Sequence, residues 1–280
     1  MSSWTKIAGH PVSPGQVSLV GVPWDEGSSF LQGPVRAPGH IRAALFSPSS
    51  NSSTESGLEL ADEARLRDVG DLEVPAGAAA VAAIEAGIGA LLDAGASVLA
   101  LGGDHAITYP ILRAHAGRRE RVSILHFDAH PDLYDEFAGN RFSHASPFAR
   151  IMEAGLATRL VQVGIRTMNA HQREQARRFD VEVIEMRSFS PDLTLRFDGP
   201  VYVTIDLDAL DPAFAPGVSH HEPGGLSTRE VIGVLQRLRG RVIGADVVEL
   251  NPERDPTEVT AMVAAKLVKE LLARILADGS

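Results

Sequence analysis

Six short runs of hydrophobic, largely β-branched residues constrain the fold of this 280-residue chain more than any other feature. Residues of this kind favour strands, and a strand that is apolar along its whole length has to be covered on both faces. We therefore predict six buried strands, at residues 17–21, 97–101, 121–127, 160–164, 201–206 and 241–248.

The stretches between these runs are rich in alanine and place hydrophobic residues at helical spacing. They predict helices at residues 76–94, 170–179, 227–239 and 257–277. Strands that alternate with helices form a parallel sheet with helices on both sides. Because no repeat or change in composition divides the sequence, we expect residues 1–280 to form one α/β domain. In such a domain, ligands bind beyond the carboxyl ends of the strands.

Acidic residues and a histidine stand at the ends of two predicted strands. Asp128, His130 and Asp132 alternate directly after the third strand, and Asp206 and Asp208 alternate at the end of the fifth. An extended backbone would place such alternating side chains on one face. Burying several carboxylates without compensation is unfavourable, and a bound divalent cation is the simplest compensation. The sequence therefore predicts a metal site at this edge of the sheet.

Another predicted strand leads into Leu101-Gly-Gly-Asp-His105, whose turn would present His105 at the same edge. Taken alone, this segment is explained equally well as a turn in which Asp104 caps a helix. It also lacks the glycine and lysine spacing of a phosphate-binding loop. Its significance comes from the other acids, because His105 would complete a set of two imidazoles and four carboxylates.

This set of ligands, in a chain without cysteine, indicates the kind of metal. Carboxylates and imidazoles suit a hard or borderline cation such as Mn²⁺. Zinc is less favoured, because its structural sites usually include cysteine and close at four ligands. Six ligands are too many for one ion that must keep an open position. We therefore expect two ions that share carboxylates and together activate one water molecule.

Charge and the N-terminal segment exclude other classes of function. A net charge of −10 argues against a nucleic-acid partner, because binding phosphates requires patches of lysine and arginine. No hydrophobic run approaches the roughly 20 residues that span a bilayer. Residues 1–10 contain neither a signal-peptide core nor an Arg-rich presequence, and the lack of cysteine fits a reducing compartment. We expect a cytoplasmic protein without a membrane partner.

Four motifs, in this order, resemble those of the ureohydrolase (arginase/agmatinase) family: Gly-Gly-Asp-His105, Asp128-Ala-His-Pro-Asp132, Asp206-Leu-Asp208 and Asp246-Val-Val-Glu-Leu-Asn-Pro252. Four other segments look especially like plant-type arginases: Glu26-Gly-Ser-Ser-Phe-Leu-Gln-Gly-Pro34, Phe142-Ser-His-Ala-Ser146, Asp211-Pro-Ala-Phe-Ala-Pro-Gly-Val-Ser-His220 and Thr260-Ala-Met-Val-Ala-Ala-Lys266. The likeness extends from about Gly21 to about Leu272. It implies a three-layer α/β/α sandwich with a mostly parallel β-sheet, assembled as a homo-oligomer, a trimer or hexamer.

The resemblance also implies roles for individual residues. Two overlapping sets of four would each hold one Mn²⁺: His105, Asp128, Asp132 and Asp206 for the first ion, and His130, Asp128, Asp206 and Asp208 for the second. Glu249 matches the glutamate that receives a guanidinium, which suits a carboxylate because planar N–H donors bind it in pairs. His144 matches the catalytic histidine and would shuttle protons. Asp128 would pass a proton from the water to the leaving amine. For the far end of the substrate, Asn140 or Arg141 is a candidate, and no spacing in the sequence decides between them.

The implied reaction is hydrolysis of a guanidino substrate to urea and a primary amine. The plant-type likeness favours L-arginine, which gives L-ornithine, whereas agmatine or another guanidino compound is the alternative. Thr167, Met168 and Asn169 stand where animal-type arginases carry acidic residues that recognise the amine. The loop at residues 134–141 departs from the animal pattern as well.

Two other classes of function fit these residues less well. A metal-dependent deacetylase on a related fold would hold a single zinc ion with fewer ligands, and the additional ligands His105, Asp132 and Asp208 argue against it. A binding protein without activity is disfavoured because all six ligands are present together with His144 and Glu249.

Three further histidines lie close to the motifs. His126, two residues before Asp128, is expected either to hydrogen-bond a metal ligand or to pack in the core. His220 and His221 are expected to rigidify the loop that contains them.

Overall fold

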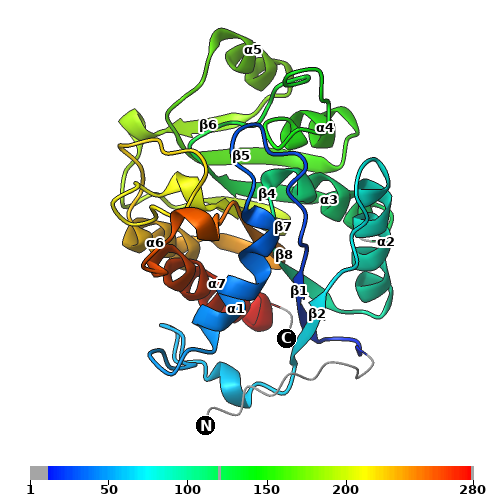
Figure 1. Cartoon of the computed structure of the whole chain (residues 1–280), viewed down its shortest axis with the longest axis vertical. Helices are drawn as coiled ribbons and strands as arrows, with labels where there is room; N and C mark the ends of the chain where they lie inside the picture. Colours follow the sequence, from blue (N-terminus) through cyan, green and yellow to red (C-terminus); the bar gives the residue numbers. More distant parts are fainter. Residues whose placement is uncertain (1–11, 119–120, 279–280) are drawn as a thin grey trace.

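The hydrophobic runs of the sequence lie side by side in one sheet (Figure 1). The computed structural model describes residues 12–118 and 121–278, and in these ranges the sheet has eight strands. They are β1 (Val17–Gly21), β2 (Leu66–Asp71), β3 (Ser97–Leu101), β4 (Val122–Phe127), β5 (Ala157–Ile165), β6 (Glu182–Glu185), β7 (Arg196–Asp206) and β8 (Arg239–Val248). Their order across the sheet is β2-β1-β3-β8-β7-β4-β5-β6. Each neighbouring pair is parallel, which confirms the predicted sheet and makes it parallel throughout.

Helices cover both faces of this sheet and complete the three layers (Figure 1). They are α1 (Ala37–Leu45), α2 (Ala79–Asp93), α3 (Thr108–Ala116), α4 (Pro147–Glu153), α5 (Ala170–Arg178), α6 (Thr228–Arg237) and α7 (Val259–Asp278). On one face, α1, α6 and α7 form a core with the sheet that includes Ile41, Val234 and Leu271. On the other face, α2, α3 and α4 contribute Ile84 and Ile111, among other buried residues, to a second core.

Several short elements were not predicted from the sequence. Strands β2 and β6 lie at the two edges of the sheet and are mostly half-buried, so they do not need a continuous apolar run. Helices α1, α3 and α4 each contain a proline near their start: Pro38, Pro110 and Pro147. Proline is tolerated in the first helical turn because the N–H groups there have no partner within the helix. In a short segment, a proline interrupts the helical spacing of hydrophobic residues, and for this reason the three helices were not predicted.

The central strands bring the predicted site residues together. Strands β3, β8, β7 and β4 are consecutive neighbours in the sheet, so their carboxyl ends meet at one edge. They end at Leu101, Val248, Asp206 and Phe127. Three candidate motifs begin at or just after one of these residues, and the fourth, at residues 246–252, runs across the end of β8.

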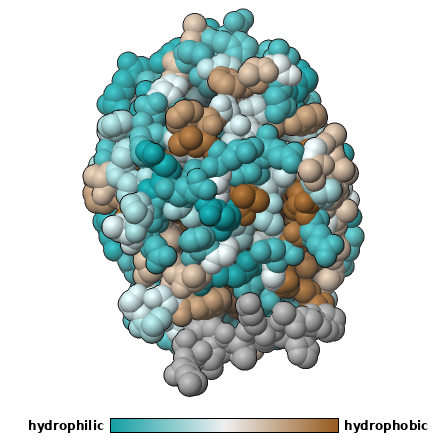
Figure 2. All heavy atoms as spheres, viewed as in Figure 1, coloured by the Kyte–Doolittle hydropathy of each residue, from teal (hydrophilic) through white to brown (hydrophobic). Residues whose placement is uncertain are grey.

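The face shown in Figure 2 is mostly hydrophilic, with hydrophobic side chains in small groups. Of the large hydrophobic side chains that the structure describes as exposed, Phe30 is the most accessible, at 68%. Within residues 12–118 and 121–278, no helix combines the length and the apolar character needed to cross a membrane.

Candidate metal centre

All six predicted metal ligands converge at the carboxyl edge of the central strands, but the backbone that carries them differs from our expectation. Strand β4 ends at Phe127, so Asp128, His130 and Asp132 lie in the loop that follows and not on one face of a strand. Asp132 has a φ of 48°, which a strand could not contain. The loop turns these side chains toward Asp206, the last residue of β7, so convergence depends on the turn and not on strand alternation.

One group of ligands surrounds the side chain of His105. Its Nδ1 lies 3.2 Å from Oδ2 of Asp128, 3.1 Å from Oδ2 of Asp132 and 3.3 Å from Oδ2 of Asp206. This nitrogen is buried and makes no hydrogen bond to any residue that the structure describes. An imidazole lone pair that faces three carboxylate oxygens has the chemistry of a cation site.

A second group surrounds His130. Its Nδ1 lies 3.0 Å from Oδ2 of Asp208 and 3.4 Å from Oδ1 of Asp128. Asp128 therefore directs one carboxylate oxygen toward each histidine, which is the arrangement that a bridging ligand requires. Asp206 faces His105 through Oδ2, while its Oδ1 accepts a hydrogen bond of 2.8 Å from the backbone N–H of Asp208.

The electrostatics of these carboxylates also suit cations. Burial, reinforced by the charge of Asp128, raises the pKa of Asp132 to about 6. Burial and the neighbouring carboxylates of Asp208 and Asp128 hold the pKa of Asp206 well above its ordinary value. Carboxylates that crowd together out of water resist ionising together, and divalent cations remove this penalty. The donor set, with its orphaned His105 Nδ1, thus fits a pair of hard cations.

A buried chain of hydrogen bonds sets the tautomer of His105. Asp246 in β8 accepts hydrogen bonds from the hydroxyls of Thr108 (3.0 Å), Tyr202 (2.9 Å) and Thr204 (2.5 Å). Because the proton of Thr204 is committed to Asp246, Thr204 Oγ1 must accept from His105 Nε2, which lies 3.0 Å away. The proton of the ring therefore sits on Nε2, and Nδ1 keeps its lone pair for a metal.

Asp104 and Gly103 position His105 from the other side. The Asp104 side chain accepts from the backbone N–H of Ala106 at 3.1 Å, which confirms the capping interpretation of this motif and is compatible with His105 as a ligand. A Cβ atom at Gly103 would collide with the carbonyl oxygen of Trp24, so only glycine lets the two segments approach this closely.

Arg166 holds the loop that carries Asp208. Its guanidinium donates to the carbonyl oxygens of Asp208 (2.7 Å), Ala209 (3.2 Å) and Glu222 (2.9 Å). No role for Arg166 was predicted from the sequence. The feature that could have indicated this role is the planar guanidinium of arginine, whose five N–H donors can bind several carbonyl oxygens at once.

His126 both hydrogen-bonds a predicted metal ligand and packs in the core, the two roles that the sequence left open. Its ring stacks on Phe148 with 4.0 Å between centroids, and its Nε2 lies 2.8 Å from Oδ2 of Asp128. Burial lowers the pKa of His126 to about 4, so the ring is neutral. Since Gln162 donates to Nδ1 at 3.0 Å, the ring proton is on Nε2 and is donated to Asp128.

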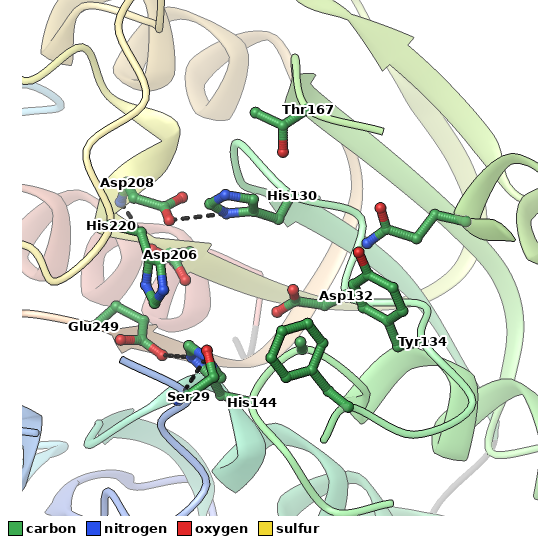
Figure 3. A pocket seen from close by; sticks show the side chains of 13 residues that line it. Ser29, His130, Asp132, Tyr134, His144, Thr167, Asp206, Asp208, His220 and Glu249 are labelled. Atoms are coloured by element: carbon green, nitrogen blue, oxygen red, sulfur yellow. Dashed lines mark hydrogen bonds and ion pairs between the residues drawn. The ribbon is translucent and has the colours of Figure 1, made fainter. Parts of the chain in front are cut away.

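His144 and Glu249 form a pair beside the ligands (Figure 3). His144 Nδ1 lies 2.8 Å from Glu249 Oε1, and the same oxygen accepts the backbone N–H of His105 at 2.9 Å. Burial lowers the pKa of His144, but the charge and hydrogen bond of Glu249, together with the charges of Asp104 and Asp132, outweigh it and raise the pKa to about 9. Glu249 directly follows β8 and has a φ of 68°, a left-handed conformation that is uncommon outside glycine and typical of functional sites.

Several of these groups line a pocket with a volume of about 150 Å³. Asp206, Asp208, His130, Asp132, His144 and Glu249 form its inner part, and the other lining residues are Ser29, Tyr134, Phe137, Ala145, Thr167, Gln172 and His220. None of this second group was proposed from the sequence as a pocket residue. All but Gln172, which belongs to α5, lie outside the helices and strands described above, and no spacing in the sequence indicates which loop side chains meet.

Three residues near the pocket were given roles from the sequence. Asn140 is exposed, and its Oδ1 accepts the backbone N–H of Phe142 at 2.8 Å, which places it outside the pocket lining. His221 donates to the carbonyl oxygen of Pro216 at 2.7 Å and so ties its loop together, as expected. His220 instead lines the pocket, where its ring centroid lies 5.3 Å from that of His144.

Comparisons with known proteins agree with this geometry. The sequence model of the Arginase family matches residues 15–273. "Arginase 1, mitochondrial" from Arabidopsis thaliana is 51% identical over 275 residues, which cover 92% of this chain and 80% of that protein. An agmatinase from Bacillus anthracis is 32% identical over 95% of this chain and 94% of its own length. The solved structure of an arginase from Medicago truncatula superposes with a TM-score of 0.88 at 44% identity, covering 94% of this chain and 88% of that one.

Proposed function

The chain belongs to the arginase family, and on this premise we propose that it hydrolyses L-arginine to L-ornithine and urea. The observation that carries the proposal is the convergence of six candidate metal ligands, four of which line one pocket together with Glu249 and His144. The likeness to plant arginases extends over nearly the whole chain and favours arginine over agmatine as the substrate.

We propose that the site holds two Mn²⁺ ions. His105, Asp132, Asp128 and Asp206 would hold one ion, and His130, Asp208, Asp128 and Asp206 the other. The absence of cysteine and the oxygen-rich donor set support manganese over zinc. When bound, such a pair of cations supplies the Lewis acidity that activates water near neutral pH.

Glu249 orients the substrate. Both hydrogen bonds that the described residues make to its carboxylate are on Oε1, so Oε2 is available to the N–H donors of a guanidinium. The guanidinium carbon is a poor electrophile because its positive charge spreads over three nitrogens. Holding this carbon in line with the attacking water therefore supplies a large part of the rate enhancement.

Asp128 and His144 move the protons. Asp128, which reaches both groups of ligands, accepts a proton from the attacking water and passes it to the leaving nitrogen, because an amine leaves only when protonated. His144 bonds to Glu249, lines the same pocket and replaces protons from solvent. Its position next to a carboxylate favours the protonated form that this task requires.

The proposal also covers the domain organisation, the oligomeric state and the location of the protein. One parallel sheet running through the described residues supports a single domain over residues 1–280. A homo-oligomer, trimer or hexamer, is proposed from the family alone. We also propose a cytoplasmic location, although residues 1–11, which bear on it, lie outside the described residues and the Arabidopsis relatives carry mitochondrial or chloroplastic names.

The test is to remove metal from the protein, reload it with Mn²⁺ and measure urea from arginine, agmatine and short guanidino acids at matched concentrations. Specificity is defined by the ratio kcat/KM, and we expect this ratio to be highest for arginine. Metal analysis should find two ions per chain. One ion per chain would favour the single-zinc deacetylase alternative, and a metal-loaded protein inert toward every guanidine would indicate a binding protein without activity.

A further inference from the structure

Ser29 contacts the outer nitrogen of His144 with two groups at once (Figure 3). Its backbone N–H lies 3.1 Å from His144 Nε2, and its hydroxyl oxygen lies 2.7 Å from the same atom. The two residues come from different loops, 115 positions apart in the chain. His144 is 8% exposed, whereas Ser29 is exposed and lines the pocket. Ser29 thus lies between a buried imidazole and solvent.

The two groups of Ser29 suit different protonation states of the ring. A backbone N–H can only donate, so its bond to Nε2 needs the lone pair of a neutral imidazole, with the ring proton on Nδ1 facing Glu249. A hydroxyl can also accept, so it can bind the Nε2–H of an imidazolium. Each state of His144 therefore finds a partner on Ser29 without a rotation of the ring.

The remaining surroundings of His144 leave Ser29 as its exposed polar neighbour. The charged and titratable groups that face the ring are Glu249, Asp104, Asp132 and His220. Of these, Glu249, Asp104 and Asp132 are buried. The ring of His220 lies beside His144, and Phe30 in turn lies 5.7 Å from His220, so aromatic rings cover this side.

We infer that Ser29 is a positioning residue for His144 and the group through which His144 exchanges its proton with water. As the Nε2–H bond of the imidazolium breaks, that proton bonds to Ser29 Oγ, and the original hydroxyl proton of Ser29 passes to a water molecule. Serine ends neutral, and one proton has moved from His144 to solvent. The reverse sequence protonates the ring again. The inference rests on the proposed function, because that reaction gives His144 a proton to move.

The order serine, histidine, carboxylate also occurs in nucleophilic catalysis, but this geometry favours a different role. A base that activates a serine hydroxyl uses the lone pair of Nε2 for that hydroxyl alone. Here the backbone N–H of Ser29 competes for the same lone pair, so the arrangement holds the ring in place more than it activates the hydroxyl.

The first experiment compares Ser29→Ala, Ser29→Thr and Ser28→Ala in the Mn²⁺-loaded enzyme with arginine as substrate. Ser28 is a matched control, because its neighbouring hydroxyl bonds to Asp104 at 3.2 Å and not to His144. Ser29→Ala should lower kcat by about 100-fold, the low end of the contribution of a positioned proton-transfer group. Added imidazole buffer should restore much of this loss, and Ser29→Thr and Ser28→Ala should stay close to wild type. Wild-type kcat in Ser29→Ala, or a loss that no buffer restores, would overturn the inference.

The second experiment does not depend on activity. In metal-free protein labelled with ¹⁵N, the His144 ring is titrated by NMR in wild type and in the same three variants. Loss of the acceptor for Nε2–H should lower the pKa of His144 in Ser29→Ala by about one pH unit, the effect of one hydrogen bond to a charged group. An unchanged titration would contradict the inference even if the enzyme proved active. If the wild-type enzyme released no urea, the proposed function would be refuted. The NMR titration of His144 would still show whether Ser29 hydrogen-bonds to its ring.

Discussion

The side chain of Thr204 lies 3.0 Å from Nε2 of His105, and this contact decides which nitrogen of the histidine faces the carboxylates. The hydroxyl can play this part because its own proton is donated to Asp246 at 2.5 Å. A polar group outside the ring of ligands thus favours the tautomer that directs Nδ1 of His105 toward a metal.

Replacing Thr204 with valine should therefore weaken metal binding. The variant keeps the shape of a buried residue in β7 but frees His105 to place its proton on Nδ1. We expect Mn²⁺ affinity to fall by about 10- to 100-fold, the usual effect of losing a partner of a metal ligand. Competition with a fluorescent chelator measures it. Thr204→Ser keeps the hydroxyl and should bind normally, and equal affinity in Thr204→Val and wild type would refute the tautomer argument.

Replacing Asp128 with asparagine should abolish urea release. The change preserves size but removes the charge shared by the two groups of ligands, as well as the base that accepts a proton from water. Activity should fall by at least about 1,000-fold, as expected when a group acts in both binding and chemistry. Asp135→Asn in the same loop, where the carboxylate bonds to Gln175, is the control. Full activity in Asp128→Asn, or after complete metal removal, would rule out the mechanism.

The sequence allowed the ligands to be predicted because each one stands at the end of a strongly apolar run. Such runs form the buried centre of a parallel sheet, and topology alone then brings their ends together. The strand geometry offered as the reason for Asp128, His130 and Asp132 was wrong, because β4 stops at Phe127. These side chains still meet the other candidate ligands because the loop after the strand also turns inward.

The outer pocket could not be predicted in the same way. Ser29 and Tyr134 lie in loops, and His220 belongs to a loop segment whose neighbour His221 points elsewhere. Which of two adjacent histidines enters a pocket depends on the path of the backbone, which is set by long-range contacts such as those of Arg166. A single sequence contains no periodic signal for this choice.

Glu55 provides a test of stability against pH. It bonds to Arg229 at 2.6 Å and 2.7 Å and to Gln236 at 2.8 Å, with Lys266 3.3 Å away. The hydrogen bonds from Arg229 dominate and lower the pKa of Glu55 from 4.5 to about 2. Because the folded pKa is depressed, the stabilisation is present above pH 4.5 and is lost as the pH falls toward 2.

Glu55→Gln should therefore reduce the free energy of unfolding at pH 7 by about 1 kcal/mol or less, since these partners are largely exposed. The difference from wild type should be smaller at pH 3.5. Urea denaturation of metal-free protein at both pH values measures it without a contribution from metal release. Glu253→Gln, which removes an exposed pair with Arg36, should have no such effect. A difference that grew as the pH fell would contradict the assigned pKa shift.

Tyr134 should distinguish arginine from agmatine. Its hydroxyl oxygen accepts a hydrogen bond of 2.7 Å from Asn169 Nδ2, so its own proton is available to another acceptor in the pocket. Among the described residues that line the pocket there is no lysine or arginine, so a substrate carboxylate would have to bind neutral donors. Tyr134→Phe should lower kcat/KM for arginine by about 5- to 10-fold, the effect of one neutral hydrogen bond, and leave agmatine unchanged because it has no carboxylate. Asn140→Ala is the comparison, and a selective loss for arginine in that variant but not in Tyr134→Phe would assign the far end of the substrate to Asn140 instead.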